Sequence, residues 1–566
     1  MRRHPIAVVL AALAAGAWYA AVPPRARALP PPPAGLQMPV RGAMHIHTRR
    51  SDGAGTVDDV AAAAGRAGLQ FVITTDHGDG TRAPDVPSYR GGVLCIDAVE
   101  ISTNGGHLLA LGIGATPYPL GGEPRDVVED VTRMGGLSLV AHPVSTKPEL
   151  NWTDWTAPFV GLEWLNGDTE WRDEKPMQLA RALLSYPFRK PEALALLLDR
   201  SDATMRQWDA LTRVRRVVAV AGGDAHARIT FSAETDAYRE RKFVPIPGYE
   251  AMFRTFSIAL PQVAFSGDAA ADARAVVEEL SQGRVYSAID AMAGPVAFAF
   301  SATSGKHRAV AGEALTITAP PSLHVDVQAP ADALISLIED GRQVLEAKGS
   351  TLGYMAEPRP AVYRVEVKLP GAPGEPPVPW IVSNPIYVGR KVVDGVAPAP
   401  RAPASAAEIL YRDGPVPDWR IELGPTSDGA VDVIKAVGGT QVLFRYALSG
   451  VASASPYAAL VVPAGRRISR HDRLSFRARA DHPMRVSIQL RVPGTGPGER
   501  WARSVFLDDS SRDVTVFFDE MVPRGATSTP RPDLSKVESI LFVVDTVNTR
   551  TGTAGQVWLD DVRYER

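Results

Sequence analysis

The stretch AMHIHTRRSDG, residues 43–53, closes a short apolar run with two histidines one residue apart and an aspartate five positions later. Residues i and i+2 of a strand lie on the same face, so His45 and His47 can act on one ligand. They can equally be ordinary polar residues at a strand end. The decision depends on whether other strand ends carry similar residues.

Further apolar runs follow between residues 43 and 290, and the histidines of this region lie at or beside the ends of such runs. The runs are LQFVITTDH (69–77), GVLCIDAVEIS (92–102), HLLALGIG (107–114), LSLVAHP (137–143), FVGLEWLNG (159–167) and VVAVAGGDAH (217–226). Helical patterns alternate with them at TVDDVAAAAGRAG (56–68), which opens with a Thr-x-x-Asp cap, at 123–135 and over much of 174–215. Apolar runs without two-residue alternation predict strands buried on both faces, as in a parallel barrel.

Six of the 11 histidines lie at these strand ends. They are His45, His47, His77, His107, His142 and His226. The carboxyl ends of barrel strands share one face, so residues far apart in sequence can meet there. Imidazole together with carboxylate ligands suits zinc, manganese or iron rather than calcium. The joint pattern therefore predicts a metal site.

The order His-x-His, Asp, Asp-His, Glu, His, Ala-His-Pro, Gly-Asp-x-His resembles the PHP (polymerase and histidinol phosphatase) family, over about half of the chain. The resemblance implies a distorted (β/α)7 TIM-like barrel at residues 43–294 with two to three divalent metals (Zn, Mn or Fe). It places one metal on His45, His47, Glu100 and Asp224. It places a second on Glu100, His107 and His142, and a third on Asp52, His77 and His226. Asp52 would favour a harder metal such as Mn or Fe at the third position.

The resemblance implies a metal-dependent hydrolase acting on a small-molecule ester through metal-activated hydroxide. A phosphoester is the first expectation. A carboxyl or carbamate ester is the alternative, since exported chains of this kind also resemble a carbaryl-hydrolase-like branch. We expect catalytic roles for Glu100, Asp224 and Asp76, although Asp76 could instead close the turn after its strand.

Basic residues near the motifs could bind an anionic substrate. Lys147 follows the AHP motif and Arg228 follows GDAH, and each could equally be a solvated surface charge. Glu163 and Asn166 in GLEWLNG could line the pocket, with packing and turn roles as the alternative.

The residue pattern changes after residue 295, where it predicts short strands and turns but no long helix. We expect an all-β Ig-like sandwich at 295–395, a Pro/Ala linker at 396–407 and a jelly-roll-type β-sandwich at 408–566. These β-domains could hold a carbohydrate or cell-surface ligand. Three tryptophans could serve as sugar platforms or as core residues: Trp419, Trp501 and Trp558. A third functional alternative is therefore a surface glycan-binding protein with an inert barrel.

The N-terminus predicts export to the periplasm or the outside of a bacterial cell. Two arginines precede an apolar run from Ile6 to Val22, and ARA at 26–28 offers a cleavage site. Residues 1–28 therefore predict a signal peptide or an uncleaved N-terminal anchor, and the Pro-rich residues 29–42 a linker. Membrane contact is expected only if the segment stays uncleaved.

Charge and cysteine content narrow the function further. The formal net charge is −2, which argues against a nucleic-acid partner. Cys95 is the single cysteine, so no intramolecular disulfide can form, and its apolar surroundings predict a buried strand residue.

Overall fold

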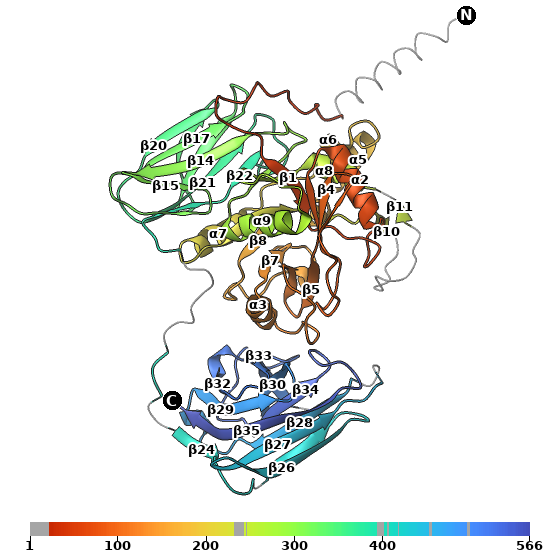
Figure 1. The fold of residues 1–566 in the computed structure, drawn as a ribbon, viewed down its shortest axis with the longest axis vertical. Coiled ribbons are helices and arrows are strands. Elements are labelled where there is room, and N and C mark those ends of the chain that lie inside the picture. Colours follow the sequence, from red (N-terminus) through yellow and green to blue (C-terminus); the bar gives the residue numbers. More distant parts are fainter. Residues whose placement is uncertain are drawn as a thin grey trace, which may run out of the picture. The chain divides into compact units, whose positions relative to one another are not determined.

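The computed structural model describes residues 22–230, 243–244, 246–392, 401–404, 407–416, 418–451, 455–494 and 498–566 (Figure 1). Most of the predicted signal segment and part of the predicted 396–407 linker lie outside these residues. The chain divides into two compact units. The first holds residues 1–114 and 123–396, and the second holds 115–122 and 397–566.

The first unit is built on a 12-stranded sheet that mixes parallel and antiparallel pairs. Strands β1, β2 and β4 are parallel, whereas β1 pairs with β12 and β12 with β13 in antiparallel register. The members of this sheet are β1 (Val40–Met44), β2 (Phe71–Thr74), β3 (Ser88–Arg90), β4 (Val93–Asp97), β12 (Ser257–Leu260), β13 (Tyr286–Ala288), β16 (Ala314–Leu315), β18 (Leu334–Glu339), β19 (Arg342–Lys348), β21 (Ala361–Lys368), β22 (Ile381–Ser383) and β23 (Ile386–Val388).

A second, five-stranded sheet completes the part of this unit that carries the histidines. It runs in the order β5 (Val99–Thr103), β6 (Gly106–Leu111), β7 (Leu137–Ala141), β8 (Gly161–Asn166) and β9 (Val218–Gly222). Side chains of both sheets share one core, for example Met44 and Ile258 from the first and Leu139 and Val220 from the second. This shared core fixes the two sheets against each other.

The prediction of a distorted (β/α)7 TIM-like barrel is wrong. The strands before residue 295 divide among separate sheets with several antiparallel pairs and do not form one closed ring of parallel strands. The physical reason is visible between β5 and β6. Asn104 and Gly105 turn the chain between directly paired strands, so β5 and β6 form a hairpin with no room for a crossover helix.

Eight helices are described, and they cover the sheets of the first unit (Figure 1). They are α2 (Val57–Ala67), α3 (Pro124–Arg133), α4 (Gly167–Arg172), α5 (Pro176–Ser185), α6 (Lys190–Ala195), α7 (Asp202–Thr212), α8 (Tyr249–Thr255) and α9 (Ala269–Gln282). The predicted cap of α2 is confirmed: the Thr56 hydroxyl accepts from the Asp59 amide, and the Asp59 carboxylate accepts from the Thr56 amide. None of the described helices is long and apolar enough to cross a membrane.

The strands after residue 295 do not form the separate Ig-like sandwich that we expected. β22 pairs with β13, so the 12-stranded sheet continues into this region. A four-stranded sheet accompanies it, with β14 (Phe298–Ser304), β15 (His307–Val310), β17 (Ser322–Val327) and β20 (Thr351–Met355). A two-stranded ladder joins β10 (Ile229–Thr230) and β11 (Phe243–Val244).

The second unit has the expected β-sandwich character. One sheet holds β24 (Ala407–Tyr411), β26 (Asp428–Ala436), β27 (Gly439–Ala447), β29 (Arg473–Ala480), β32 (Arg512–Phe517) and β35 (Ala554–Glu565). The other holds β25 (Arg420–Leu423), β28 (Tyr457–Pro463), β30 (Met484–Val492), β31 (Glu499–Leu507), β33 (Val522–Pro523) and β34 (Ser539–Asp545). Alternate residues from both sheets, such as Phe476 and Phe542, meet in one core.

Candidate metal centre

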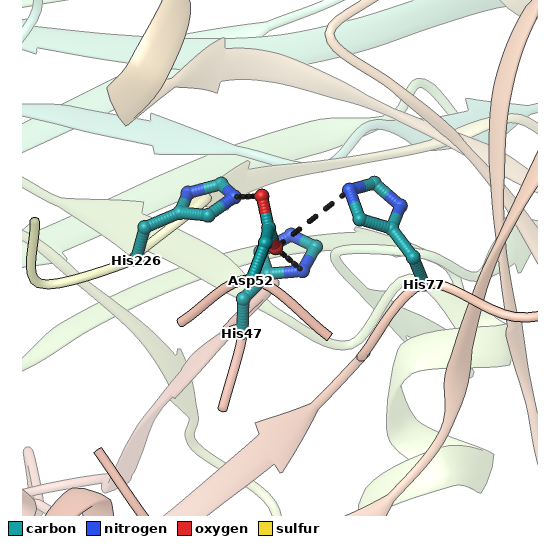
Figure 2. Close-up of side chains that lie close together, drawn as sticks. All are labelled: His47, Asp52, His77 and His226. Atoms are coloured by element: carbon teal, nitrogen blue, oxygen red, sulfur yellow. Dashed lines mark ion pairs between the residues drawn. The ribbon is translucent and has the colours of Figure 1, made fainter. Parts of the chain in front are cut away.

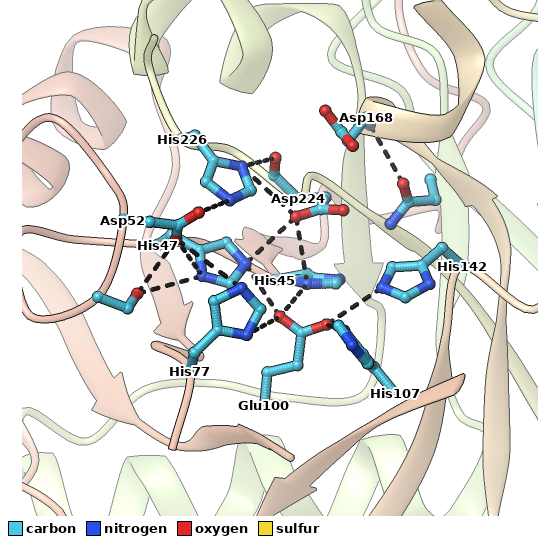
Figure 3. Close-up of polar contacts among 12 residues, drawn as sticks. His45, His47, Asp52, His77, Glu100, His107, His142, Asp168, Asp224 and His226 are labelled. Atoms are coloured by element: carbon cyan, nitrogen blue, oxygen red, sulfur yellow. Dashed lines mark hydrogen bonds and ion pairs between the residues drawn. The ribbon is translucent and has the colours of Figure 1, made fainter. Parts of the chain in front are cut away.

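The predicted site residues converge where the two histidine-bearing sheets of the first unit end. Isolated parallel bridges join Ile46 to Ala225 and His77 to Glu100, and so place these chain segments side by side. Figure 3 shows all nine predicted ligands in one cluster. The sequence pattern thus located a real convergence, although the barrel that was expected to produce it is absent.

Glu100 lies at the centre of this cluster and is only 1% exposed. Its two carboxylate oxygens lie between 2.8 and 3.3 Å from ring nitrogens of five histidines, namely His45, His47, His77, His107 and His142. The Oε2 atom faces three of these rings and the Oε1 atom faces two. If metal ions bound here, Glu100 would offer both of its carboxylate oxygens as ligands.

Two further carboxylates, those of Asp52 and Asp224, also contact histidines of the cluster. Oδ1 of Asp224 lies 3.4 Å from Nε2 of His45 and 3.2 Å from Nε2 of His47. Oδ2 of Asp52 lies 3.1 Å from Nε2 of His226, and its Oδ1 lies 3.4 Å from Nδ1 of His47 (Figure 2). His77 completes this group at 3.9 Å from Asp52.

Three sets of potential ligand atoms lie within 4.8 Å of one another. They are His47, Asp52, His77 and His226; His45, His47 and Asp224; and His77, Glu100 and His107. These sets partly differ from the assignment that the family resemblance implies, because His47 joins the Asp52 set and His77 joins the Glu100 set. His142 is instead held by Glu100, at 3.1 Å.

Two buried ring nitrogens in the cluster, Nε2 of His47 and Nδ1 of His77, make no hydrogen bond in the described structure. Both lie within 3.3 Å of Glu100, but in poor hydrogen-bond geometry. A buried polar atom without a partner is costly unless another ligand satisfies it. The donor set of imidazoles and carboxylates is therefore one that divalent zinc, manganese or iron would fit.

The electrostatics of the metal-free cluster follow from its buried charges. Burial lowers the pKa of His47, but Asp224 and Glu100 outweigh this and raise it to about 10. Burial would raise the pKa of Glu100, yet His45 and His77 hold it well below its ordinary value. Burial lowers the pKa of His77, and Glu100 only partly offsets that effect. In the absence of metal, protonated His47 thus offsets the charge of Glu100 and Asp224, whereas His77 does not contribute in this way.

At three positions of the cluster, the backbone has a positive φ, a conformation that residues other than glycine rarely adopt. His45, His142 and Asp224 have φ values of 59°, 30° and 45°. Residues held in this region cost of order 1–3 kcal/mol each and persist where the surroundings fix them, commonly at functional sites. These positions therefore carry strain together with the potential ligands.

Glu163 contacts two of the predicted ligands, His45 and His142, and fixes their positions. Its Oε1 lies 2.7 Å from Nδ1 of His45, and its Oε2 accepts from the His142 amide at 2.8 Å and from Nδ2 of Asn166 at 2.7 Å. With Nδ1 engaged, His45 presents Nε2 to the cluster. Gly222 makes this possible, because a Cβ there would lie 1.6 Å from Oε1 of Glu163.

Asp76 lies outside the ligand sets. Its carboxylate accepts from the amide and hydroxyl of Thr48 and from the hydroxyl of Ser51, each at 2.7 Å. Asp76 is therefore engaged in fixing the loop between His47 and Asp52. These contacts differ from the predicted alternative, a hydrogen bond closing the turn after Asp76's own strand, and the catalytic role of Asp76 stays a prediction.

The two predicted substrate-binding residues are placed differently. A terminal nitrogen of Arg228 lies 3.7 Å from Asp52, and the side chain is mostly buried. Lys147 is exposed at the start of a short 3-10 helix, Pro148–Leu150, and its amide donates to the Ser145 hydroxyl. The structure thus brings Arg228 to the cluster but gives no contact that brings Lys147 there.

A cavity of about 280 Å³ adjoins the cluster, and Asp224, His226 and Arg228 line it. Apolar side chains of α5, α6 and the following turn form much of its wall, including Leu179, Ala182, Tyr186, Leu194 and Leu197, and Asp168, Glu170 and Trp171 of α4 also line it. Sequence reasoning did not find this cavity. The only available signal was the apolar spacing within residues 176–198, which is equally typical of core packing.

No family model and no curated protein matches the chain. A family 11 carbohydrate-binding module of a Clostridium thermocellum cellulase aligns at 19% identity and a TM-score of 0.25, covering 29% of this chain and 95% of the module. A carbohydrate-binding module of the β-sandwich superfamily aligns at 12% identity and a TM-score of 0.21, covering 43% of this chain and 91% of the module. An exo-β-agarase aligns at 14% identity and a TM-score of 0.20, covering 27% of this chain and 25% of the agarase.

Proposed function

We propose that this chain is a metal-dependent hydrolase of small esters. The observation that carries the proposal is the convergence of nine histidine, aspartate and glutamate side chains, with Glu100 at their centre and two of their ring nitrogens left without a hydrogen bond. A merely structural cluster would be expected to satisfy its buried polar atoms. The order of these residues, which resembles that of the PHP family, supports the same proposal.

Different residues of the chain would bind the metals, orient a ligand and bind the substrate. The three ligand sets would hold two to three divalent ions, which supply Lewis acidity and lower the pKa of water. Glu100 would hold neighbouring ions at a fixed spacing, and Glu163 would keep His45 oriented. Arg228, beside Asp52, would offer positive charge to an oxygen of the substrate.

The cavity beside the cluster favours an ester with an apolar part. Its 280 Å³ is about twice the volume of an engineered apolar cavity of roughly 150 Å³ that binds benzene. The wall is formed largely by leucine, alanine and tyrosine side chains, which do not compensate a second negative charge. We therefore rank a carboxyl or carbamate ester ahead of a phosphoester.

The test is metal analysis of the purified protein, combined with hydrolysis of p-nitrophenyl phosphate, acetate and N-methylcarbamate before and after chelation. We expect two to three metal equivalents and activity that chelation abolishes and Zn, Mn or Fe restores. Glu100→Gln should lose both, whereas Glu279→Gln, on α9, should keep both. A metal-free, folded protein, or unchanged turnover by Glu100→Gln, would overturn the proposal.

The proposed location is outside the cytoplasm. The apolar run from Ile6 to Val22, preceded by two arginines, supports export through a cleaved signal or an uncleaved anchor. N-terminal sequencing of the protein from the producing cells would distinguish these two forms.

Carbohydrate binding by the second unit is a second candidate. Trp501 lies in its core and Trp419 packs against that core, so these two do not offer an open platform. Trp558 lies on β35, between core residues Val557 and Leu559, and the Arg479 guanidinium lies 3.6 Å above its ring. Stacking on an aromatic ring is how such platforms work, so Trp558→Ala should weaken retardation in polysaccharide-containing gels. Unchanged mobility of the unsubstituted protein in every polysaccharide would dismiss this candidate.

A further inference from the structure

Helix α5 and the turn after it expose four large apolar side chains. They are Met177 (82% exposed), Leu183 (58%), Leu184 (69%) and Phe188 (61%). Scattered single exposed hydrophobic residues are ordinary, but four of them within 12 positions are a local concentration of exposed apolar surface. We call these four residues the α5 face. The opposite side of the same helix, with Ala182 and Ser185, is buried.

The N-terminal segment reaches the body of the first unit beside this face. The Arg189 guanidinium, adjacent to Phe188, donates to the carbonyl of Pro23. The chain is then tied down by the Arg27 amide, which donates to the Met292 carbonyl at 2.8 Å, and by an ion pair between Arg27 and Asp332 at 2.7 Å. Residue 23 therefore has a fixed place next to the end of the α5 face.

The apolar run of the N-terminus ends one residue before this fixed point, at Val22. One residue spans about 3.8 Å, so a membrane that held Ile6 to Val22 would lie within a few ångströms of Arg189 and Phe188. Three exposed basic residues lie beside this segment: Arg181 is on α5, Arg25 lines the same surface cavity as Arg181, and Lys190 follows Arg189 in the chain. Leucine, methionine and phenylalanine side chains flanked by lysine and arginine are typical of surfaces that lie on an anionic lipid bilayer.

We propose that the α5 face docks on the surface of the lipid bilayer into which residues 6–22 insert. The four apolar side chains would enter the boundary between headgroups and acyl chains, and the basic residues would contact anionic headgroups. This inference concerns the uncleaved chain and does not depend on the proposed hydrolase activity.

The test places an environment-sensitive fluorophore at either end of the α5 face of the full chain. Single cysteines are introduced as Met177→Cys or Phe188→Cys, and Met355→Cys, at an exposed position on β20, is the matched control. The only native cysteine, Cys95, is buried, so the unsubstituted chain gives the labelling background. Each protein is reconstituted in phosphatidylcholine vesicles with phosphatidylglycerol, with and without nitroxide-labelled lipid.

Docking predicts a blue shift and several-fold stronger nitroxide quenching at both residue 177 and residue 188 than at residue 355. The two positions are 11 residues apart, about 16 Å along a helix, so a tether alone would affect residue 188 without reaching residue 177. Leu183→Ser with Leu184→Ser should reduce quenching at residue 177, while Val344→Ser, on β19, should not. Circular dichroism checks that each variant is folded.

Three results would overturn the proposal. Quenching at residue 188 alone would mean that the N-terminus only tethers the protein. A blue shift without vesicles that grows with protein concentration would mean that a second copy of the chain covers the face. A blue shift without vesicles at every concentration would mean that residues 1–21 cover it.

Discussion

The Nδ1 atom of His45 lies 2.7 Å from Oε1 of Glu163, and both side chains are fully buried. This contact assigns the two ring nitrogens of His45 different tasks. Nδ1 is bound to the supporting carboxylate, and Nε2 faces Glu100 and Asp224. A supporting contact of this kind fixes ring orientation and raises the basicity of a metal-binding histidine.

Glu163→Gln should weaken metal binding without unfolding the protein. One glutamine oxygen cannot accept every bond that the carboxylate takes from His45, His142 and Asn166. We expect metal affinity to fall about 10–100-fold, measured by competition with a chromogenic chelator. Glu279→Gln, which changes a glutamate on α9 outside the ligand sets, is the control. Equal affinity of Glu163→Gln and wild type would contradict a positioning role.

Gly222→Ala should disturb the same contact by adding one methyl group. The added Cβ would overlap Glu163, so either the strand or the carboxylate has to move. Overpacking of this kind typically costs about 1–3 kcal/mol, and we expect a lower melting temperature together with weaker metal binding. Gly353→Ala, where a Cβ meets nothing within 4 Å, should leave metal binding unchanged. Normal metal binding in Gly222→Ala would show that Glu163 tolerates displacement.

Asp52→Asn should remove one metal and leave the others. The Asp52 carboxylate serves the set with His47, His77 and His226, whereas His45 and Asp224 belong to another set. Elemental analysis should therefore show about one equivalent less per chain, with the remaining metal retained through dialysis. Asp58→Asn changes an exposed carboxylate on α2 and should keep the full complement. Loss of all metal from Asp52→Asn would mean that the sets are not separable.

Metal affinity should rise with pH. The pKa of His47 is about 10 in the metal-free protein, above its ordinary value of 6.5, so its proton has to leave when a metal binds. The same shift stabilises the metal-free fold below about pH 6.5, and this stabilisation is lost as the pH rises through about 10.

Calorimetric titration in buffers of different ionisation enthalpy should record proton release on metal binding. His47→Gln should release fewer protons, and its metal-free form should lose less stability on raising the pH than the wild type loses. His324→Gln, at an exposed position on β17, should match the wild type in both measurements. Proton-neutral metal uptake by the wild type would contradict the predicted charge state of the cluster.

Filling the cavity should affect substrates according to size. Ala182 lines the cavity from α5, and Ala180 is exposed on the same helix. Ala182→Phe should raise KM for esters with a bulky apolar group and spare esters with a methyl group, while metal content stays normal. Ala180→Phe should leave both classes unchanged. Equal loss toward small and bulky esters would place the substrate outside this cavity.

The residues of the site could be predicted from the sequence because each one carries its own chemistry. Histidine and carboxylate residues at strand ends signal a metal site regardless of how the strands pair. Glu163 was harder to predict, because its role depends on a contact with His45, 118 residues away in the chain. Asp76 shows the same limit, since a carboxylate beside His77 could either join the cluster or close its own turn.

The arrangement of the strands could not be predicted from apolar runs alone. Such runs indicate that a strand is buried but not the direction of its neighbour. β5 and β6 are antiparallel because a short turn connects them. β22 joins β13 although its paired residue Ile381 lies 93 positions after Ala288 in the chain. The capping box of α2 was predictable because all its partners lie within four residues.

Residues 115–122 leave the first unit and belong to the second. There, Nδ2 of Asn548 donates to the carbonyls of Pro119 and Gly121, and the rings of Tyr118 and Phe506 lie 6.3 Å apart. The C-terminal sandwich is thus not contiguous in the sequence. A single cut near residue 397 would not isolate the whole unit, and recombination at that point would not transfer it intact. A transplanted copy would lack an eight-residue strip encoded almost 300 positions upstream, and it would have to regain those partners from its new host.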